Sequence, residues 1–532
     1  FLFFFQLFGP SPPIVVSRRT TYITSPLRAD GLPDYEKYVR ETFRRDIAPN
    51  DNAAALLWRA LGPGNLTPEQ FRALTRELGL NEIPSADSTL QPLKEDDLVD
   101  RMLELFPSVE AGSAPLETHK LLSQVQKHPW VGGQLPPISA WVDANAAPLD
   151  LVVEASHRER FYSPSLTPLA NPKDRLIGMT LPHRLGAREA ARALAIRAMR
   201  RVGDKHLAEA WQDILAQHRL AQLVAQGPTV VEQDAAWVIS NTACRETIAL
   251  LSSEQLTKDL AQQIQHDLAS LAPFANVADR TDQFERLLEL DAVVNNDFEL
   301  FAALQPDGKP PHLRANRGSI DRNLILEQLN TKYDAAVAAM RLPTFEARKA
   351  AFDQLLAQSP PVPTDDNIET SQMVAAFLSR NARSEMLGSF VTSSVLPSAS
   401  VTSAAEDRTN TYLTLTKLAA ALAVFQTEHG NYPEKLEERA PAVLDKLPVD
   451  LYHGKPYLYK RTNDGYLLYT AGENGIDDGG SSVQFSTYEG QDYENAPNND
   501  AESLRSKVPG DADDLSIRIP VESLKTPKPK PP

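Results

Sequence analysis

Apolar positions recur every three or four residues along most of this chain, which is the spacing of one face of an α-helix. The segment after Pro228 shows this spacing in a single stripe of Trp237, Asn241, Cys244, Ile248 and Leu251. Helix starts are marked at residues 67–70 and 228–232, where a capping threonine stands three positions before a glutamine or glutamate and next to a proline. The pattern therefore predicts a mainly α protein.

The same reasoning places the individual helices. We expect them at residues 188–202, 207–224, from 229 onward, 282–303, 320–340, 344–357 and 369–379. The first pair, broken at Gly203-Asp204, has the small residues of a tetratricopeptide unit, but no repeat of about 34 residues follows it. We therefore expect an irregular, solenoid-like, multi-helix body.

Near the C-terminus the period changes from that of a helix to that of strands. Residues 456–460 and 466–469 are short and aromatic, and Asn463-Asp464-Gly465 between them is a strong hairpin signal. Residues 515–520 alternate and would add a third strand. Before them, residues 408–429 form an amphipathic helix that we expect to pack one face on the sheet, with Leu415, Leu418, Leu422 and Phe425 on that face and Thr414, Lys417 and Ala421 opposite. The prediction is a small α+β domain of one helix plus a short antiparallel sheet.

Proline, glycine and small residues suggest where these parts join. A joint within residues 107–137 and a linker or loose helix start at 393–405 divide the chain into an N-terminal helical region (18–135), a helical body (136–400) and the α+β domain (405–520). An acidic insertion occupies residues 481–509, and 521–532 form a disordered proline- and lysine-rich tail. Residues 1–8 are almost wholly apolar, and we expect residues 1–17 to be the remnant of an N-terminal membrane anchor.

Composition narrows the function classes. The chain has 532 residues and a net charge of −16, which argues against nucleic acid as a partner because phosphate binding needs clustered lysine and arginine. Its single cysteine, Cys244, excludes an intrachain disulfide and a cysteine-based zinc site.

An ordered series of motifs between His429 and Gly480 resembles the globular part of a type II secretion major pseudopilin. The series is His429-Gly430-Asn431-Tyr432-Pro433, Leu447-Pro448-Val449-Asp450, Gly454-Lys455-Pro456-Tyr457-Leu458-Tyr459 and a glycine-rich acidic loop at 472–480. Segments from Thr20-Thr21-Tyr22-Ile23 to Gln226-Gly227-Pro228-Thr229 resemble a large family of planctomycete envelope proteins that carry such a module. This resemblance implies an inner-membrane anchor, a bulk located in the periplasm, and contacts with envelope or secretion-system proteins.

Major pseudopilins bind calcium in the loop after the second strand and in an acidic segment before the last strand. The resemblance carries this site to Asn474, Asp477, Asp478, Asp513 and Asp514. Calcium prefers six to eight oxygen ligands, so carboxylates and backbone carbonyls are suitable. Asn474 stands where the family has aspartate, and the insertion at 481–509 separates the two halves, so we expect a weakened structural site or a solvated turn cluster.

Candidates for catalysis are few. Glu154, His157 and Glu159 are close in sequence, and Glu154 with Asp213 is the carboxylate pair that a glycan hydrolase could use. We expect His218 and Cys244 to be core residues, because both fall on apolar helix faces. The arginines of one helix are more consistent with intramolecular pairing or an acidic partner than with nucleic acid: Arg188, Arg192, Arg197, Arg200 and Arg201.

The sequence thus favours a non-enzymatic, membrane-anchored envelope protein that acts as a scaffold or adaptor through its pseudopilin-like domain, linked to type II secretion or pilus-type machinery. Two other interpretations remain open. One is a soluble module that binds peptides or proteins between the helices at residues 188 and 229. The other is a carboxylate-dependent hydrolase of cell wall or glycan.

Overall fold

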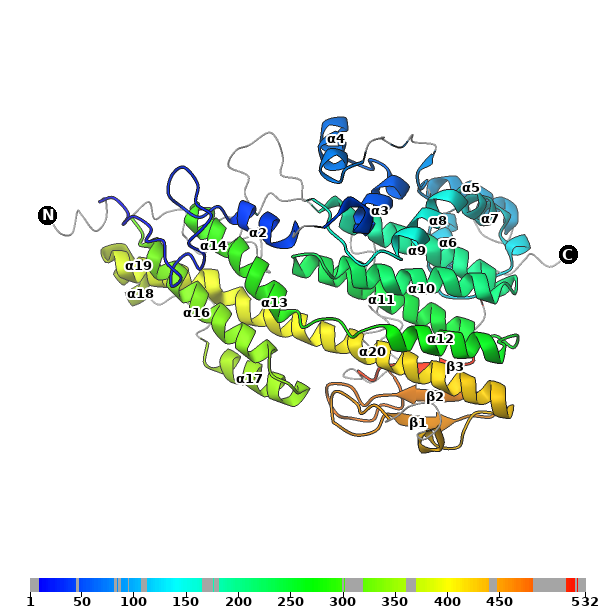
Figure 1. Ribbon diagram of the computed structural model, residues 1–532. Coiled ribbons are helices and arrows are strands. Elements are labelled where there is room, and N and C mark those ends of the chain that lie inside the picture. Colours follow the sequence, from blue (N-terminus) through cyan, green and yellow to red (C-terminus); the bar gives the residue numbers. More distant parts are fainter. Residues whose placement is uncertain are drawn as a thin grey trace.

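Figure 1 shows the computed structural model of the chain, in which the described residues are 9–44, 47–80, 84, 88–93, 95–106, 112–164, 176, 181–298, 301, 319–359, 370–439, 447–481, 513–521 and 524. The protein is mainly helical, with one small three-stranded antiparallel sheet. Residues 1–8 of the expected membrane-anchor remnant (1–17), most of the insertion at 481–509 and most of the tail at 521–532 lie outside the described residues. Within the described part of the chain, no helix combines the length and the apolar character needed to cross a bilayer.

The helices follow one another from the N-terminus with few breaks. The first group is α2 (Tyr35–Arg44), α3 (Ala53–Leu61), α4 (Pro68–Glu77), α5 (Glu95–Leu105), α6 (Ala114–Gln124), α7 (Pro136–Ala144) and α8 (Ala146–Ala155). The second is α9 (Pro182–Gly203), α10 (Leu207–Val224), α11 (Val230–Leu251), α12 (Lys258–Ser270), α13 (Ala278–Arg280), the π-helix η5 (Thr281–Glu285) and α14 (Arg286–Val294). The third is α16 (Arg322–Met340), α17 (Phe345–Ala357), α18 (Thr370–Leu378), α19 (Arg380–Val391) and α20 (Val395–His429).

Local sequence signals set many of these boundaries. Thr67 and Thr229 cap α4 and α11, and each accepts a hydrogen bond from the amide three residues later, at 3.3 and 3.0 Å. The predicted helix at residues 282–303 is wrong in length. It is divided between η5 and α14 and ends at Val294, because Asn296 adopts a left-handed conformation with φ of 61° that stops a helix.

The sheet confirms the predicted hairpin and third strand. β1 (Leu458–Arg461) pairs antiparallel with β2 (Tyr466–Tyr469), which pairs antiparallel with β3 (Ser516–Ile519) in the order β1-β2-β3. In β3, Ile517 and Ile519 are buried while Arg518 between them is exposed. The alternation therefore turns one side of β3 to the core.

Helix α20 connects the helical body with the sheet and is the longest helix of the described chain. Residues 393–405, predicted as a linker or a loose helix start, form the short helix η7 (Thr392–Ser394) and the first turns of α20. Its C-terminal half lies between α11 and α12 on one side and strands β2 and β3 on the other (Figure 1). The face predicted to lie opposite the sheet is covered as well, since Nζ of Lys417 donates to the Leu271 carbonyl at 2.6 Å. Ala419, Ala420 and Ala421 are buried, and such small side chains allow neighbours to approach from two sides.

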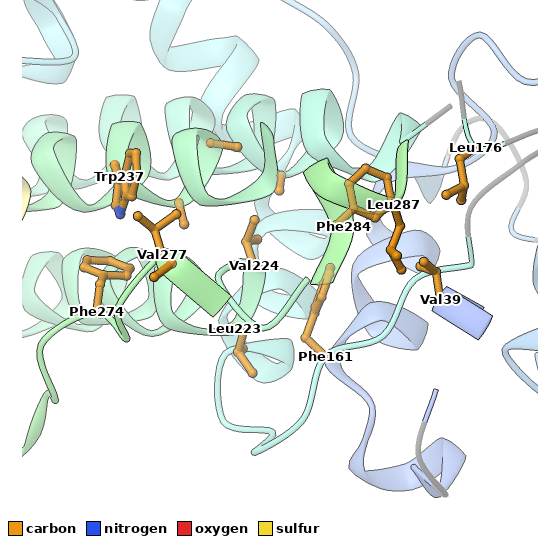
Figure 2. Packing of buried hydrophobic residues seen from close by; sticks show 14 of the residues in the cluster. Val39, Phe161, Leu176, Leu223, Val224, Trp237, Phe274, Val277, Phe284 and Leu287 are labelled. Atoms are coloured by element: carbon orange, nitrogen blue, oxygen red, sulfur yellow. The ribbon is translucent and has the colours of Figure 1, made fainter. Parts of the chain in front are cut away.

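Two hydrophobic clusters form the core. Both cross the predicted boundary at residue 135, and the second also crosses the one at residues 400–405. The first joins α2, α3 and α8 to α11, α14, α16, α19 and the start of α20, and Figure 2 shows Val39, Phe161, Val224, Trp237 and Phe284 among its side chains. The second joins Leu135 and Ile138 to α10, α11, α20 and the sheet. The chain segments on either side of residue 135, and on either side of residues 400–405, therefore bury their apolar side chains together.

Candidate functional site

The antiparallel pairing of β2 with β3 brings two acidic segments together. Tyr469, the last residue of β2, is opposite Ser516, the first residue of β3. The loop at 470–481 that leaves β2 therefore lies beside Asp513 and Asp514, which precede β3. The amide of Thr470 donates to the Leu515 carbonyl at 3.1 Å and closes this corner.

Three carboxylates meet at this corner. Oxygen atoms of Asp478, Asp513 and Asp514 all lie within 4.8 Å of one another. Two calcium ligands on opposite sides of the ion are separated by about 4.8 Å, since each Ca–O bond is about 2.4 Å. The spacing is therefore compatible with one ion held by three carboxylates.

Backbone amides hold two of these carboxylates by one oxygen each. Oδ2 of Asp513 accepts from the amides of Glu473 and Asn474 at 3.0 and 3.1 Å. Oδ2 of Asp514 accepts from the amides of Asp478 and Gly480, both at 2.9 Å. The second oxygen of each, Oδ1, is buried and has no hydrogen-bond partner. The positions of both carboxylates are thus set by the loop, while one oxygen of each remains available to a ligand.

Burial and mutual repulsion favour the protonated forms. The Asp514 side chain belongs to a residue that is only 1% exposed. Burial raises the pKa of its carboxyl to about 6, the amides of Gly480 and Asp478 act in the opposite direction, and the charges of Asp478 and Asp477 raise it further. Burial likewise raises the pKa of Asp513. A divalent cation would remove this penalty, because it replaces the protons with a bound positive charge.

The other two predicted ligands, Asn474 and Asp477, hold the turns of the loop. Oδ1 of Asn474 accepts from the Ile476 amide at 2.7 Å, and Oδ1 of Asp477 accepts from the Gly479 amide at 3.0 Å. The side chains of the five predicted residues thus divide into a group of three that converge and a group of two that shape the backbone around them.

Neighbouring residues that were not predicted as site residues fix the loop to the rest of the molecule. The Thr470 hydroxyl is hydrogen-bonded to the buried carboxylate of Asp450, and Glu473 forms an ion pair with Arg408 of α20 at 2.9 Å. A ring nitrogen of His453 is 2.9 Å from the Gly472 carbonyl. The Leu447-Pro448-Val449-Asp450 motif was the signal for Asp450, whereas no local signal pointed to Arg408.

Gly472 is required by the close approach of the two acidic segments. A Cβ atom at this position would lie 1.9 Å from Oδ1 of Asp513, and the backbone φ of 60° is unfavourable for other residues. The loop can therefore reach Asp513 only with glycine at this position.

Asp213 and Glu154, the carboxylates considered for glycan hydrolysis, do not converge as the three aspartates do. Asp213 is fully buried and bonded to Arg197 at 2.6 and 3.0 Å and to Arg201 at 2.7 Å. Glu154 is exposed and pairs with Arg158 at 3.6 Å. A glycosidic bond cannot reach Asp213, so these two carboxylates do not form the open pair that such chemistry requires.

The other residues considered for chemistry are core or surface groups. The ring of His218 is buried, lies 3.1 Å from the Thr247 hydroxyl and has a pKa lowered to about 3 by burial. Cys244 is buried, which confirms the predicted core position, and burial raises the pKa of its thiol to about 12. His157 interacts with Arg219 at 3.1 Å, and burial followed by this arginine lowers its pKa.

The basic helix is largely paired within the molecule. Besides the two arginines on Asp213, Arg200 forms ion pairs with Asp143 at 2.6 Å and Asp204 at 3.4 Å. Helices α9 and α11 pack directly against each other and share the first hydrophobic cluster. The groove for a peptide that one interpretation placed between them is filled by this contact.

A large cavity lies elsewhere, beside the N-terminal segment. It has a volume of about 640 Å³ and is lined by Arg18, Tyr22, Lys332, Glu385 and Ser389 among others. These residues come from the N-terminal segment, α16 and α19, far along the chain from the carboxylate cluster.

Comparisons of the chain with models of protein families, with curated proteins and with solved structures found no match. The candidate site is a three-carboxylate corner of a small sheet that packs on a long helix.

Proposed function

We propose that the protein is a non-enzymatic, membrane-anchored scaffold or adaptor of the cell envelope. Its bulk would lie in the periplasm, and its pseudopilin-like C-terminal module, residues 405–481 and 513–520, would contact components of type II secretion or pilus-type machinery. The resemblance of the motifs between His429 and Gly480 to a major pseudopilin motivates this class of partner.

The observation that carries the proposal is the double coverage of α20. A subunit that assembles into a filament through a helix needs an exposed apolar helix face for its neighbours. In α20 the apolar residues Leu415, Leu418 and Leu422 are buried, and the helix contacts both the helical body and the sheet. Partner contacts therefore have to use the loops and the rim of the sheet, as in an adaptor rather than a filament subunit.

The rim of the module offers apolar contact points. Val449 and Ile476 are 52% and 51% exposed, in the segments before β1 and after β2. Among the described residues of the module these are the large apolar side chains with the greatest exposure, and apolar side chains form the core of protein contact surfaces. We therefore assign the partner surface to these two loops.

We further propose that a calcium ion bound by Asp478, Asp513 and Asp514 stabilises this surface. The two buried carboxylate oxygens without hydrogen-bond partners favour a cation at this corner. The ion would have a structural role, because it would join the loop after β2 to the segment before β3.

Affinity purification from native envelopes tests the adaptor function. Deleting residues 405–520 would be uninformative, because it removes the buried α20 and sheet side chains that form the second hydrophobic cluster together with α10 and α11, and their loss would expose that core. The variant of choice is Val449→Ser with Ile476→Ser, which changes only exposed side chains. We expect it to lose secretion or pilus-type components that the unchanged protein retains.

Leu116→Ser with Val131→Ser is the matched control, since both side chains are exposed and lie outside the module. Components lost with the first variant but kept with the control would support the proposal. Identical recovery of such components with all three proteins, or their absence from all three, would overturn it.

A further inference from the structure

Helix α18 carries the densest group of exposed apolar side chains in the described chain. Val374, Phe377 and Leu378 are 51%, 53% and 45% exposed and fall at the i, i+3 and i+4 positions of one helix face. The helix has the sequence TSQMVAAFL and contains no charged residue. Its outer face can thus enter an apolar medium without desolvating a charge.

Hydrogen bonds place this helix next to the N-terminal segment. The guanidinium of Arg383 donates to the Phe377 carbonyl at 3.2 Å and to the Ser319 carbonyl at 2.9 Å. The next residue, Ile320, donates its amide to the Ser11 hydroxyl at 3.3 Å. The C-terminal end of α18 and Ser11 are therefore joined through two residues of one connecting segment.

The sequence that directly precedes this segment is apolar. Residues 1–8 have the sequence FLFFFQLF and directly precede Gly9, where the described chain begins. In Figure 1, α18 and α19 lie at the same end of the molecule as the blue segment that starts at Gly9. The exposed apolar face of α18 and the segment that follows residues 1–8 are thus at the same end of the molecule.

Positive charge accompanies this end. Arg18 and Arg19 are exposed, and Arg19 pairs with Glu327 at 3.0 Å. The Arg18 guanidinium lies 4.5 Å from the centre of the Tyr22 ring and forms no ion pair with the described residues. Both arginines line a cavity together with Glu385 and Ser389 of α19, the helix that packs on α18, and exposed arginine at this end of the molecule suits the anionic headgroup layer of a bilayer.

We propose that this end of the molecule rests on the bilayer, with the outer face of α18 inserted among the lipid headgroups. The inference builds on the membrane attachment in the proposed function and adds a second contact that orients the protein on the membrane. With nine residues, α18 is too short to span a bilayer, so it lies in the plane of the interface. The N-terminal segment and α18 together would fix which side of the helical body faces the membrane.

An environment-sensitive dye at position 374 tests the contact directly. Cys244 is buried, so Val374→Cys provides the accessible thiol in the full chain. With vesicles of phosphatidylethanolamine and phosphatidylglycerol, the dye emission should shift to the blue and be quenched by lipid-borne quenchers. The same label at Val131→Cys, on an exposed residue outside this end, should show neither change.

Vesicle affinity provides the second measurement. The triple variant Val374→Ser, Phe377→Ser and Leu378→Ser should bind these vesicles roughly tenfold or more weakly than the unchanged protein. The control Leu116→Ser, Val131→Ser and Val238→Ser also removes three exposed apolar side chains and should bind normally.

Two results would overturn the inference. One is a dye at position 374 whose emission neither shifts to the blue nor is quenched by lipid-borne quenchers while the protein is bound to vesicles. The other is equal vesicle affinity of the triple variant and the control, with all binding lost only when residues 1–8 are removed. Neither result depends on partner recovery from envelopes, so failure of this inference and failure of the adaptor function are distinguishable.

Discussion

Asp213 and Asp514 are both almost fully buried carboxylates, yet the charged side chains around them have opposite signs. Asp213 is bonded to the guanidinium groups of Arg197 and Arg201. Asp514 is bonded to two backbone amides and lies beside the carboxylates of Asp478 and Asp513. Burial raises the pKa of both groups, so burial alone does not separate them. The difference lies in the partners, because only Asp213 has cationic side chains against it among the described residues.

This difference assigns the two clusters to different roles. A carboxylate with two arginines is already neutralised and connects α9 to α10 as part of the core. Three carboxylates whose hydrogen-bond donors are all amides repel one another unless protons or a bound cation neutralise their charge. The corner of the sheet is thus the better candidate for a ligand, although Asp213 is the more deeply buried group.

The largest effect is expected at the paired cluster. Asp213→Asn would leave Arg197 buried, with only the exposed carboxylate of Asp150 to oppose its charge. We expect the free energy of unfolding to fall by about 3–5 kcal/mol, because an uncompensated buried charge is costly. Urea denaturation followed by circular dichroism measures the change. Asp143→Asn, which removes an exposed partner of Arg200, should cost only about 0–1 kcal/mol. Equal losses in the two variants would contradict a special role for the buried partner Asp213.

Calcium should have the next largest effect, and at the unpaired cluster only. At a free calcium concentration about one hundred times the dissociation constant, the unchanged protein should gain about 2.7 kcal/mol in unfolding free energy. Asp514→Asn should abolish that gain, and Asp464→Asn, in the exposed hairpin turn, should keep it. Thermal unfolding with calcium, with magnesium and with a chelator provides the measurement. A gain that survives in Asp514→Asn would place the ion elsewhere.

The smallest effect concerns pH in the absence of calcium. The pKa of Asp514 is raised from 3.8 to about 6, so the folded state holds this proton more tightly than the unfolded state. The stabilisation from this group is complete below about pH 4 and is lost as the pH rises through about 6, a change on the order of 1–2 kcal/mol. In Asp514→Asn this pH-dependent part of the unfolding free energy should be absent, which is seen when the unfolding free energies of the two proteins are plotted against pH. With calcium present the trend should reverse, because protons compete with the ion, and parallel curves for both proteins would contradict the assignment.

Local signals predicted much of the C-terminal module. The Asn463-Asp464-Gly465 turn set the hairpin, and the alternation at residues 515–520 set β3, because both depend on neighbours in the chain. The register of β2 against β3 then explains why Asp478 meets Asp513 and Asp514. The different roles within the loop were not predictable, since Asp477 differs from Asp478 only in where the backbone places it, and the sequence does not show that the Asn474 side chain holds a turn.

The sequence by itself determined the mainly α class, the helix caps at Thr67 and Thr229, the three short strands and the burial of His218 and Cys244. These features follow from residue spacing, turn chemistry and the character of single helix faces. Only the tertiary structure decided that α20 is covered on both sides, that Asp213 is closed by arginines, and that three of the five acidic-loop candidates converge. These outcomes depend on contacts between segments that are distant in sequence, and no local pattern encodes which segment will pack on a given face.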